Sequence, residues 1–144
     1  MERTRNVTHL LDTATWANSV TMPAVLPERI RRWLKAPEKK ALASVSLLEC
    51  AILHRLGRLD LAGTLREFFV AGLAEDIQVV ELSPHVCVET NTLPPDFQGD
   101  PFDRSIVATA RCLDLTLITA DPAIRDSKAC RVDYYPFKPS RLRA

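Results

Sequence analysis

Short apolar segments suited to β-strands alternate along this chain with longer segments that carry the apolar spacing of amphipathic helices. The segments that favour strands lie at residues 7–11, 40–44, 76–82, 115–119 and 131–133. Such alternation is typical of an α/β fold in which the strands form one mainly parallel sheet. In sheets of this kind, ligands bind beyond the carboxyl ends of the strands. The sequence therefore directs attention to the residues that follow each predicted strand.

Several segments between these strands favour helices, and two of them begin with recognisable capping patterns. The helices are predicted at residues 13–20, 26–36, 46–56, 61–71, 84–93 and 101–113. Ser46 and Glu49 match a capping box at the start of one helix. Asp100 fits the N-cap before Pro101, and Asp103 fits the third helical position, again as in a capping box.

The composition is that of an ordinary soluble globular protein. Of its 144 residues, 47% are hydrophobic and 26% are charged. We expect one domain over residues 1–144, with a core at about 7–136 and a basic tail at 137–144. The formal net charge of +1 excludes a protein that holds nucleic acid through bulk positive charge alone.

The cysteines indicate a reducing compartment. Cys50, Cys87, Cys112 and Cys130 are widely spaced, and no two of them form a C-x-x-C pair. Free thiols are therefore favoured over zinc ligands or disulfides, and we expect a cytoplasmic location. No signal peptide or membrane span is apparent, because Asp12 interrupts the first apolar segment.

Four acidic residues stand just after a predicted strand or in the first turn of the helix beyond one. These residues are Asp12, Glu49, Asp103 and Asp121. Taken singly, each has a structural explanation, because capping and the helix dipole stabilise carboxylates at helix N-termini by about 0.5–2 kcal/mol. If the strands before them are neighbours in one parallel sheet, however, the four side chains converge at one edge.

Converging carboxylates repel one another, and a divalent cation resolves that conflict. Carboxylate oxygens are ligands for Mg²⁺ or Mn²⁺, and a site poor in histidine and cysteine favours these hard cations over zinc. The corresponding chemistry is metal-assisted hydrolysis of a phosphodiester, in which the metal activates water.

Four short motifs carry these acids in a specific order and spacing. They are Leu10-Leu11-Asp12-Thr13, Ser44-Val45-Ser46-Leu47-Leu48-Glu49, Gly99-Asp100-Pro101-Phe102-Asp103-Arg104 and Leu117-Ile118-Thr119-Ala120-Asp121. Together they resemble the PIN-domain ribonucleases, and among those the VapC-type toxins of bacterial and archaeal toxin–antitoxin pairs. The resemblance extends from about Val7 to Pro136. It implies a PIN-like three-layer α/β/α sandwich with a mainly parallel central sheet.

The resemblance also implies roles for individual residues. The acids expected to bind one or two Mg²⁺ or Mn²⁺ ions, directly or through water, are Asp12, Glu49, Asp103 and Asp121. Thr119 is expected to act with them by orienting a metal-bound water beside the last acid. Thr13 matches a hydroxyl position next to the first acid.

Three further positions in the motifs have less settled roles. Asp100 belongs to the third motif, although capping alone explains it. Arg104 could pair with a neighbouring carboxylate or contact an RNA phosphate. Ala14 stands where many relatives carry a histidine, a departure that removes no carboxylate.

The resulting hypothesis is a metal-dependent endoribonuclease that acts as the toxin of a toxin–antitoxin pair. The resemblance implies a cognate antitoxin that covers the groove or blocks the acidic site. It also implies a homodimer with the early helices at its interface. Two alternatives remain open: a DNA-directed nuclease, and a non-catalytic binding module in which the acids only cap helices.

Overall fold

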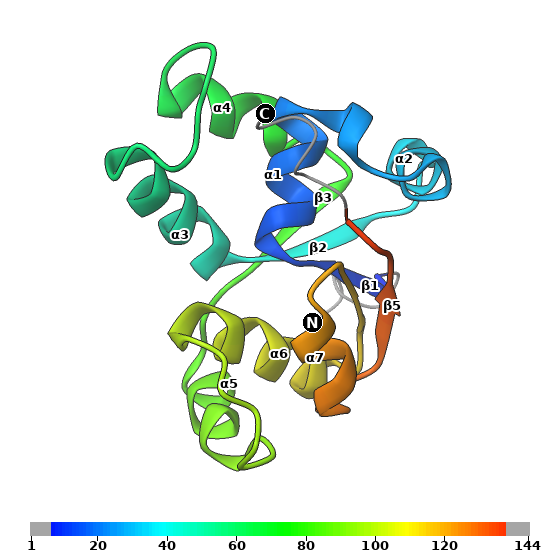
Figure 1. Ribbon diagram of the computed structural model, residues 1–144, viewed down its shortest axis with the longest axis vertical. Coiled ribbons are helices and arrows are strands. Elements are labelled where there is room, and N and C mark those ends of the chain that lie inside the picture. The colour runs from blue at the N-terminus through cyan, green and yellow to red at the C-terminus, as the bar shows by residue number, and fades with distance from the viewer. Residues whose placement is uncertain (1–6, 138–144) are drawn as a thin grey trace.

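The computed structural model describes residues 7–137 and places five strands in one central sheet (Figure 1). The strands are β1 (His9–Leu11), β2 (Lys40–Ala43), β3 (Ile77–Val80), β4 (Thr116–Thr119) and β5 (Val132–Tyr134). Their order across the sheet is β3-β2-β1-β4-β5, and every neighbouring pair is parallel. The predicted α/β class and parallel sheet are confirmed.

Successive residues of the three central strands face two separate hydrophobic cores. One core contains Leu10, Ala41 and Leu117. The other contains Leu11, Leu42 and Ile118. Because helices cover both faces, these strands are apolar on both sides and do not show the polar alternation of a half-exposed strand.

The helices form a layer on each face of the sheet, which completes a three-layer α/β/α sandwich (Figure 1). One layer holds α1 (Thr13–Thr21), α2 (Glu28–Lys35), α3 (Ser44–Arg55) and α4 (Leu65–Gly72). The other holds α5 (Pro84–Glu89), α6 (Pro101–Leu113) and α7 (Pro122–Ser127). Two short 3-10 helices, η2 (Pro23–Val25) and η3 (Thr90–Thr92), connect longer elements.

The start of α3 differs from the prediction. The helix begins at Ser44, directly after β2, and its N-cap residue Ala43 makes no side-chain cap bond. The predicted capping box of Ser46 and Glu49 is therefore wrong, because both residues lie inside the helix. Glu49 consequently stands in the second turn, where capping does not explain its carboxylate.

The start of α4 also differs from the prediction, and its cap shows why. Thr64 accepts a hydrogen bond from the Glu67 N–H at 3.1 Å, and the Glu67 carboxylate accepts one from the Thr64 N–H at 2.8 Å. This capping box starts the helix at Leu65 and not at residue 61. Leu61 still packs against the core from the preceding loop.

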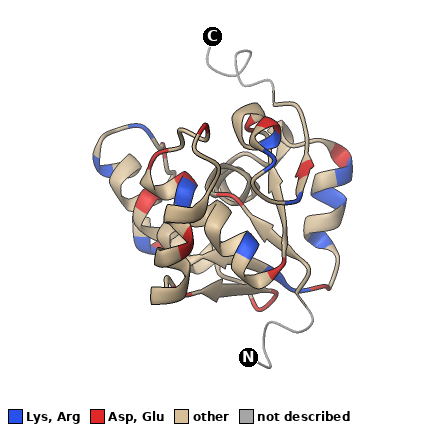
Figure 2. Cartoon of the chain, turned by 90° about the horizontal axis from the view of Figure 1, so that it is seen from below, with Lys and Arg blue, Asp and Glu red and all other residues tan. Residues whose placement is uncertain are grey.

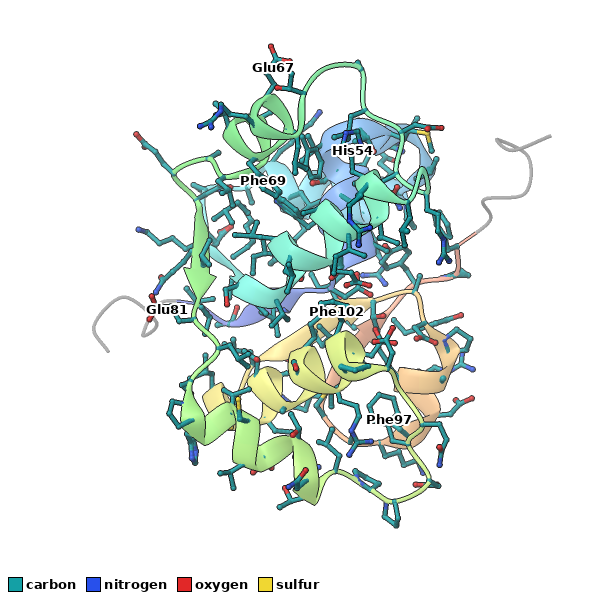
Figure 3. All side chains as sticks on the ribbon, turned by 90° about the vertical axis from the view of Figure 1, so that its left-hand side faces the viewer. His54, Glu67, Phe69, Glu81, Phe97 and Phe102 are labelled. Carbon is teal, nitrogen blue, oxygen red and sulfur yellow. The ribbon has the colours of Figure 1, made fainter. Side chains whose placement is uncertain are left out.

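α1 and α4 pack closely because α4 ends in a glycine. The Trp16 indole N–H donates to the Gly72 carbonyl at 2.8 Å. A Cβ on Gly72 would lie only 2.6 Å from the Trp16 ring, so a larger residue would push the helices apart. The Phe69 ring, labelled in Figure 3, stacks on the same indole, and the Phe68 ring packs against it at a tilt.

The remaining boundaries follow the prediction with small shifts. The sixth predicted helix is α6, which begins at Pro101 with Asp100 as its N-cap. The helix predicted at 84–93 is α5 followed by η3, and the strand predicted at 76–82 is the shorter β3. Of the basic tail predicted at 137–144, residues 138–144 lie outside the described residues.

The surface and the cysteines fit the expectations from composition. Figure 2 shows basic and acidic positions interspersed over the described helices. All four cysteines are free thiols. None of the helices between residues 7 and 137 is both long and apolar enough to cross a bilayer.

Candidate active site

Asp12 and Asp121 extend from the carboxyl ends of two adjacent strands. In the sheet register Leu11 of β1 pairs with Ile118 of β4, and the Asp12 N–H donates to the Ile118 carbonyl at 3.2 Å. Each acid then caps the helix that follows it. Asp12 accepts from the Thr15 N–H at 2.8 Å, and Asp121 accepts from the Ala123 N–H at 2.9 Å. The strand pairing thus brings these two acids to the same edge.

Glu49 and Asp103 come from helices in opposite layers. Glu49 belongs to the second turn of α3 and Asp103 to the first turn of α6, and the two helices contact one another. Figure 3 shows Phe102, the neighbour of Asp103, between the ribbons of α3 and α6. The contact between the helices carries both acids to the edge where β1 and β4 end.

Every other acid of the group raises the pKa of Asp103. Burial, and then the negative charges of its acidic neighbours, together raise its pKa from the ordinary value of 3.8 to about 7. In order of effect, those neighbours are Asp100, Glu49, Asp121 and Asp12. The structure therefore brings the four predicted acids together, with Asp100 at the rim.

Glu49 is half-buried and has one buried, unpaired oxygen. Burial raises its pKa, the Thr13 hydroxyl lowers it, and the charges of Asp100 and Asp12 raise it again. Its Oε1 atom is shielded from solvent and has no hydrogen-bond partner among the described residues. An unpaired buried oxygen is costly, so this atom is suited to a bound cation.

Several neighbouring groups stabilise the charged form of Asp12. Burial raises its pKa, whereas the hydroxyls of Thr119 and Thr15 and the Thr15 N–H lower it, and the charge of Asp121 raises it. Thr119 is fully buried, and its Oγ1 accepts from the Asp121 N–H at 3.1 Å. Thr119 therefore lies between the first and last acids, where it bonds to the backbone of Asp121 and lowers the pKa of Asp12.

Two hydroxyls fix the inner wall of the site. Thr13 Oγ1 lies 2.8 Å from Ser46 Oγ, and both side chains are buried. This bond ties the start of α1 to α3 and holds the Thr13 hydroxyl near Glu49. The local sequence around Ser46 predicts a helix cap and gives no sign of this contact with α1.

Asp100 and Arg104 have mainly structural contacts. Asp100 is exposed and caps α6 by accepting from the Asp103 N–H at 2.8 Å. Arg104 donates to the carbonyls of Phe97 at 2.9 Å and Thr90 at 2.6 Å. Among the described residues Arg104 forms no ion pair with a carboxylate, so that expected role is wrong, whereas a contact with an RNA phosphate stays a prediction. Its guanidinium fastens the loop before α6 by donating to these two backbone carbonyls.

The acids have no basic partner within residues 7–137. None of the four forms an ion pair with a lysine or arginine of that region. In the same region, no three acidic, histidine or cysteine side chains come close enough to bind a single ion together. The donors are hard carboxylate oxygens and suit Mg²⁺ or Mn²⁺, which keep water molecules among their ligands.

A groove leads away from the acids. It has a volume of about 1090 Å³ and runs between α1, α3, the loop at 57–64 and α4, with Thr13 and Glu49 in its lining. Its other charged residues are Arg58, Asp60 and Glu67, so acidic side chains outnumber basic ones. Apolar side chains such as Leu53 and Phe68 complete the lining.

The chain shares a family and a fold with known proteins. Residues 10–128 match the family model described as PIN domain. Over 91 residues the chain is 34% identical to Ribonuclease VapC22 of Mycobacterium tuberculosis (strain ATCC 25618 / H37Rv), which covers 63% of this chain and 69% of that protein.

Two solved structures illustrate the likeness in fold. VapBC2 from Rickettsia felis, bound to a DNA fragment from its promoter, gives a TM-score of 0.69 at 12% identity and covers 90% of this chain and 98% of that one. VapC20 of Mycobacterium tuberculosis, described as a sarcin-ricin loop cleaving toxin, gives 0.62 at 16% identity and covers 87% and 98%.

Proposed function

This chain belongs to the PIN-domain family, and from that premise we propose that it is a metal-dependent endoribonuclease and the toxin of a toxin–antitoxin pair. The observation that carries the proposal is the group of four half-buried acids without a basic partner among the described residues. Such a group gains most from a divalent cation.

Capping accounts for only part of this group. Asp12 and Asp121 cap helices, but the carboxylates of Glu49 and Asp103 do not. Glu49 also has the unpaired buried Oε1 atom. A binding module whose acids only cap helices would leave these two carboxylates unexplained.

In the proposed reaction the four acids hold Mg²⁺ or Mn²⁺, in part through water. When bound, such a cation acts as a Lewis acid and stabilises the negative charge that develops on the phosphodiester. Asp12 is held in place by the Thr15 N–H, and the neighbouring Thr119 hydroxyl lowers its pKa. Thr119 also fixes the backbone of Asp121, so it would keep the two acids in register during the reaction.

RNA is the favoured substrate because of the relatives. Ribonuclease VapC22 is similar in sequence, and VapC20, the sarcin-ricin loop cleaving toxin, is similar in fold. A DNA-directed nuclease is the second candidate, since hydrolysis of either backbone uses the same chemistry. A panel of RNA and DNA strands of equal sequence distinguishes the two.

The lining of the groove supports the proposal that the protein binds an antitoxin. VapBC2 is similar to this chain in fold. A groove that is apolar and has more acidic than basic side chains suits a partner segment with apolar and basic residues better than it suits a polyanion. We propose that the cognate antitoxin occupies this groove and reaches the acids. A homodimer through the early helices and a cytoplasmic location complete the proposal.

The decisive experiment is cleavage of a mixed RNA substrate in Mg²⁺, Mn²⁺ or EDTA by the antitoxin-free protein. Asp103→Asn keeps the shape of the side chain and removes its charge. We expect cleavage to fall by about 100-fold or more, because the lost cation stabilisation amounts to several kcal/mol. Asp96→Asn, in an exposed loop, is the matched control and should cleave like the wild type.

Two outcomes would count against the proposal. A folded wild type that cleaves no component of total cellular RNA in either metal would favour the binding module. Equal cleavage by wild type and Asp103→Asn would show that the active site lies elsewhere.

A further inference from the structure

Tyr135 is a buried tyrosine that no motif of the acidic site contains. It follows β5, its side chain is 1% exposed, and its ring belongs to the core around Trp16. Its backbone N–H donates to the Thr119 carbonyl at 3.1 Å. Burial raises the pKa of its phenol to about 12, so the hydroxyl keeps its proton at neutral pH.

The phenol is hydrogen-bonded to a residue at the start of α1. Its oxygen lies 2.7 Å from Thr15 Oγ1, and both side chains are buried. The Tyr135 hydroxyl has no other acceptor among the described residues, so it donates to Thr15. Thr15 then has its own proton free for another acceptor.

The Thr15 hydroxyl contacts β4, and the Thr15 backbone contacts the first acid. The hydroxyl donates to the Ile118 carbonyl at 3.4 Å. The same carbonyl accepts from the Asp12 N–H at 3.2 Å, so Thr15 and Asp12 are anchored at one point at the end of β4. The Thr15 N–H donates to Asp12 Oδ1 as well, at 2.8 Å.

We propose that Tyr135 is a positioning residue of the acidic site, which orients Thr15 so that Thr15 holds the Asp12 carboxylate ready for a divalent cation. This inference rests on the proposed function. It assigns a role to a residue that lies more than one hundred positions from Asp12 in the chain and that touches neither cation nor substrate.

Packing alone does not account for the hydroxyl. A phenyl ring would fill the same apolar space, whereas the hydroxyl adds a buried polar atom that must be paired. Its one partner among the described residues is Thr15, whose backbone N–H holds the Asp12 carboxylate. Groups that orient metal ligands from behind typically change metal affinity by about 10–100-fold when removed.

The test is Mn²⁺ binding by calorimetry without RNA, followed by RNA cleavage. Tyr135→Phe should weaken Mn²⁺ binding by roughly 10-fold and lower kcat by a similar factor, with KM for RNA unchanged. Tyr134→Phe is the matched control: it removes the same atom from the neighbouring residue, whose ring contacts Arg125 at the surface. It should bind Mn²⁺ like the wild type.

A double-mutant cycle separates positioning from stability. Thr15→Val removes the hydroxyl through which Tyr135 acts and keeps a β-branched side chain. In the Thr15→Val background, Tyr135→Phe should change Mn²⁺ affinity no further. Thr15→Ser keeps the hydroxyl and should restore most of the affinity. Thr15→Val and Thr15→Ser also test the same bond from its other end if Tyr135→Phe does not fold.

The outcomes distinguish this inference from the proposed function. Wild type that binds Mn²⁺ and cleaves RNA, together with a Tyr135→Phe variant of unchanged Mn²⁺ affinity, overturns the positioning role alone. Effects of Tyr135→Phe and Thr15→Val that simply add in the double variant overturn it as well. Wild type that neither binds Mn²⁺ nor cleaves RNA overturns the proposed function and this inference with it.

Discussion

At the scale of single residues, Asp103 shows burial and charge acting in the same direction. It is half-buried, and the charges of Asp100 and Glu49 act on it most strongly among its neighbours. Asp12 has a similar environment, but the neighbouring Thr119 and Thr15 lower its pKa. The two acids therefore differ in how firmly the protein keeps them ionised without a cation.

The raised pKa of Asp103 predicts that stability falls as the pH rises. The folded state holds this proton up to about pH 7, whereas the unfolded chain loses it near 3.8. The folded state is thus favoured at low pH and loses that advantage between these values. In EDTA at pH 8, Asp103→Asn should be more stable than wild type by on the order of 1 kcal/mol, a figure reduced for solvent screening. At pH 4.5 the two should nearly coincide.

Urea unfolding at both pH values in EDTA measures this difference. Asp96→Asn is the control and should keep the pH dependence of the wild type. An Asp103→Asn variant that is less stable than wild type at pH 8 would contradict the claim that the ionised Asp103 destabilises the folded state.

Arg104 carries a second prediction at this scale. Its guanidinium bonds to the carbonyls of Phe97 and Thr90, so Arg104→Met should lower the free energy of unfolding by about 1–3 kcal/mol. KM for RNA should stay within about twofold, because the guanidinium is occupied by the protein itself. Arg55→Met, at an exposed position, should affect stability little. A raised KM with unchanged stability would support the phosphate-binding role.

At the scale of elements, the ends of helices and strands determine where the site forms. β1 and β4 deliver Asp12 and Asp121, and the first turns of α1 and α7 hold them by capping. The acids lie beyond the carboxyl ends of the strands. At the other edge of the sheet, where β2 begins, the fully buried Lys40 fixes the sheet to α2. Its ammonium donates to the carbonyls of Leu34 at 3.1 Å and Ala36, and pairs with Asp76 Oδ2 at 3.0 Å.

Replacing this lysine should destabilise the fold and leave the site intact. Lys40→Met keeps the apolar stem but leaves two carbonyls and a carboxylate without their donor. We expect a loss of about 2–4 kcal/mol in the free energy of unfolding, measured by urea denaturation. The exposed Lys39→Met is the matched control. Loss of cleavage per folded molecule would show that Lys40 contributes to the site as well as to stability.

At the scale of the whole molecule, the site lies where the order in which the chain adds strands to the sheet reverses. From β1 the chain continues to β2 on one side and later returns to β4 on the other, so the crevice beyond β1 and β4 is the switch point of the sheet. α3 and α6 approach this crevice from opposite faces. The acids of both layers meet there, and the groove opens from the same point.

A cation bound at this point should stabilise the whole molecule. With Mn²⁺ at about 100 times its dissociation constant, the gain is about 2.7 kcal/mol, which corresponds to a rise in Tm of roughly 5–10 °C. Asp103→Asn should show a much smaller rise, and Asp96→Asn the full one. Calorimetric scans in Mn²⁺ and in EDTA measure this. Equal rises for wild type and Asp103→Asn would place Mn²⁺ binding away from the acids.

The sequence by itself determined the class of fold and the parallel sheet. Its motifs also identified the four acids that lie together in the structure. Apolar runs predict buried strands because period and burial are local properties, and Asp100, Asp12 and Asp121 occupy cap positions that their own neighbours define. The start of α3 was predicted wrongly, because the serine-to-glutamate spacing there fits a cap while the strand passes directly into the helix.

Only the tertiary structure decided which residues support the acids. Tyr135 meets Thr15, Ser46 meets Thr13, and Arg104 turns toward the carbonyls of the loop before α6. These contacts join segments that are far apart in the chain or depend on the path of a loop. A local pattern of residues cannot indicate them, because hydrogen bonds between side chains depend on how the elements pack and not on spacing along the chain.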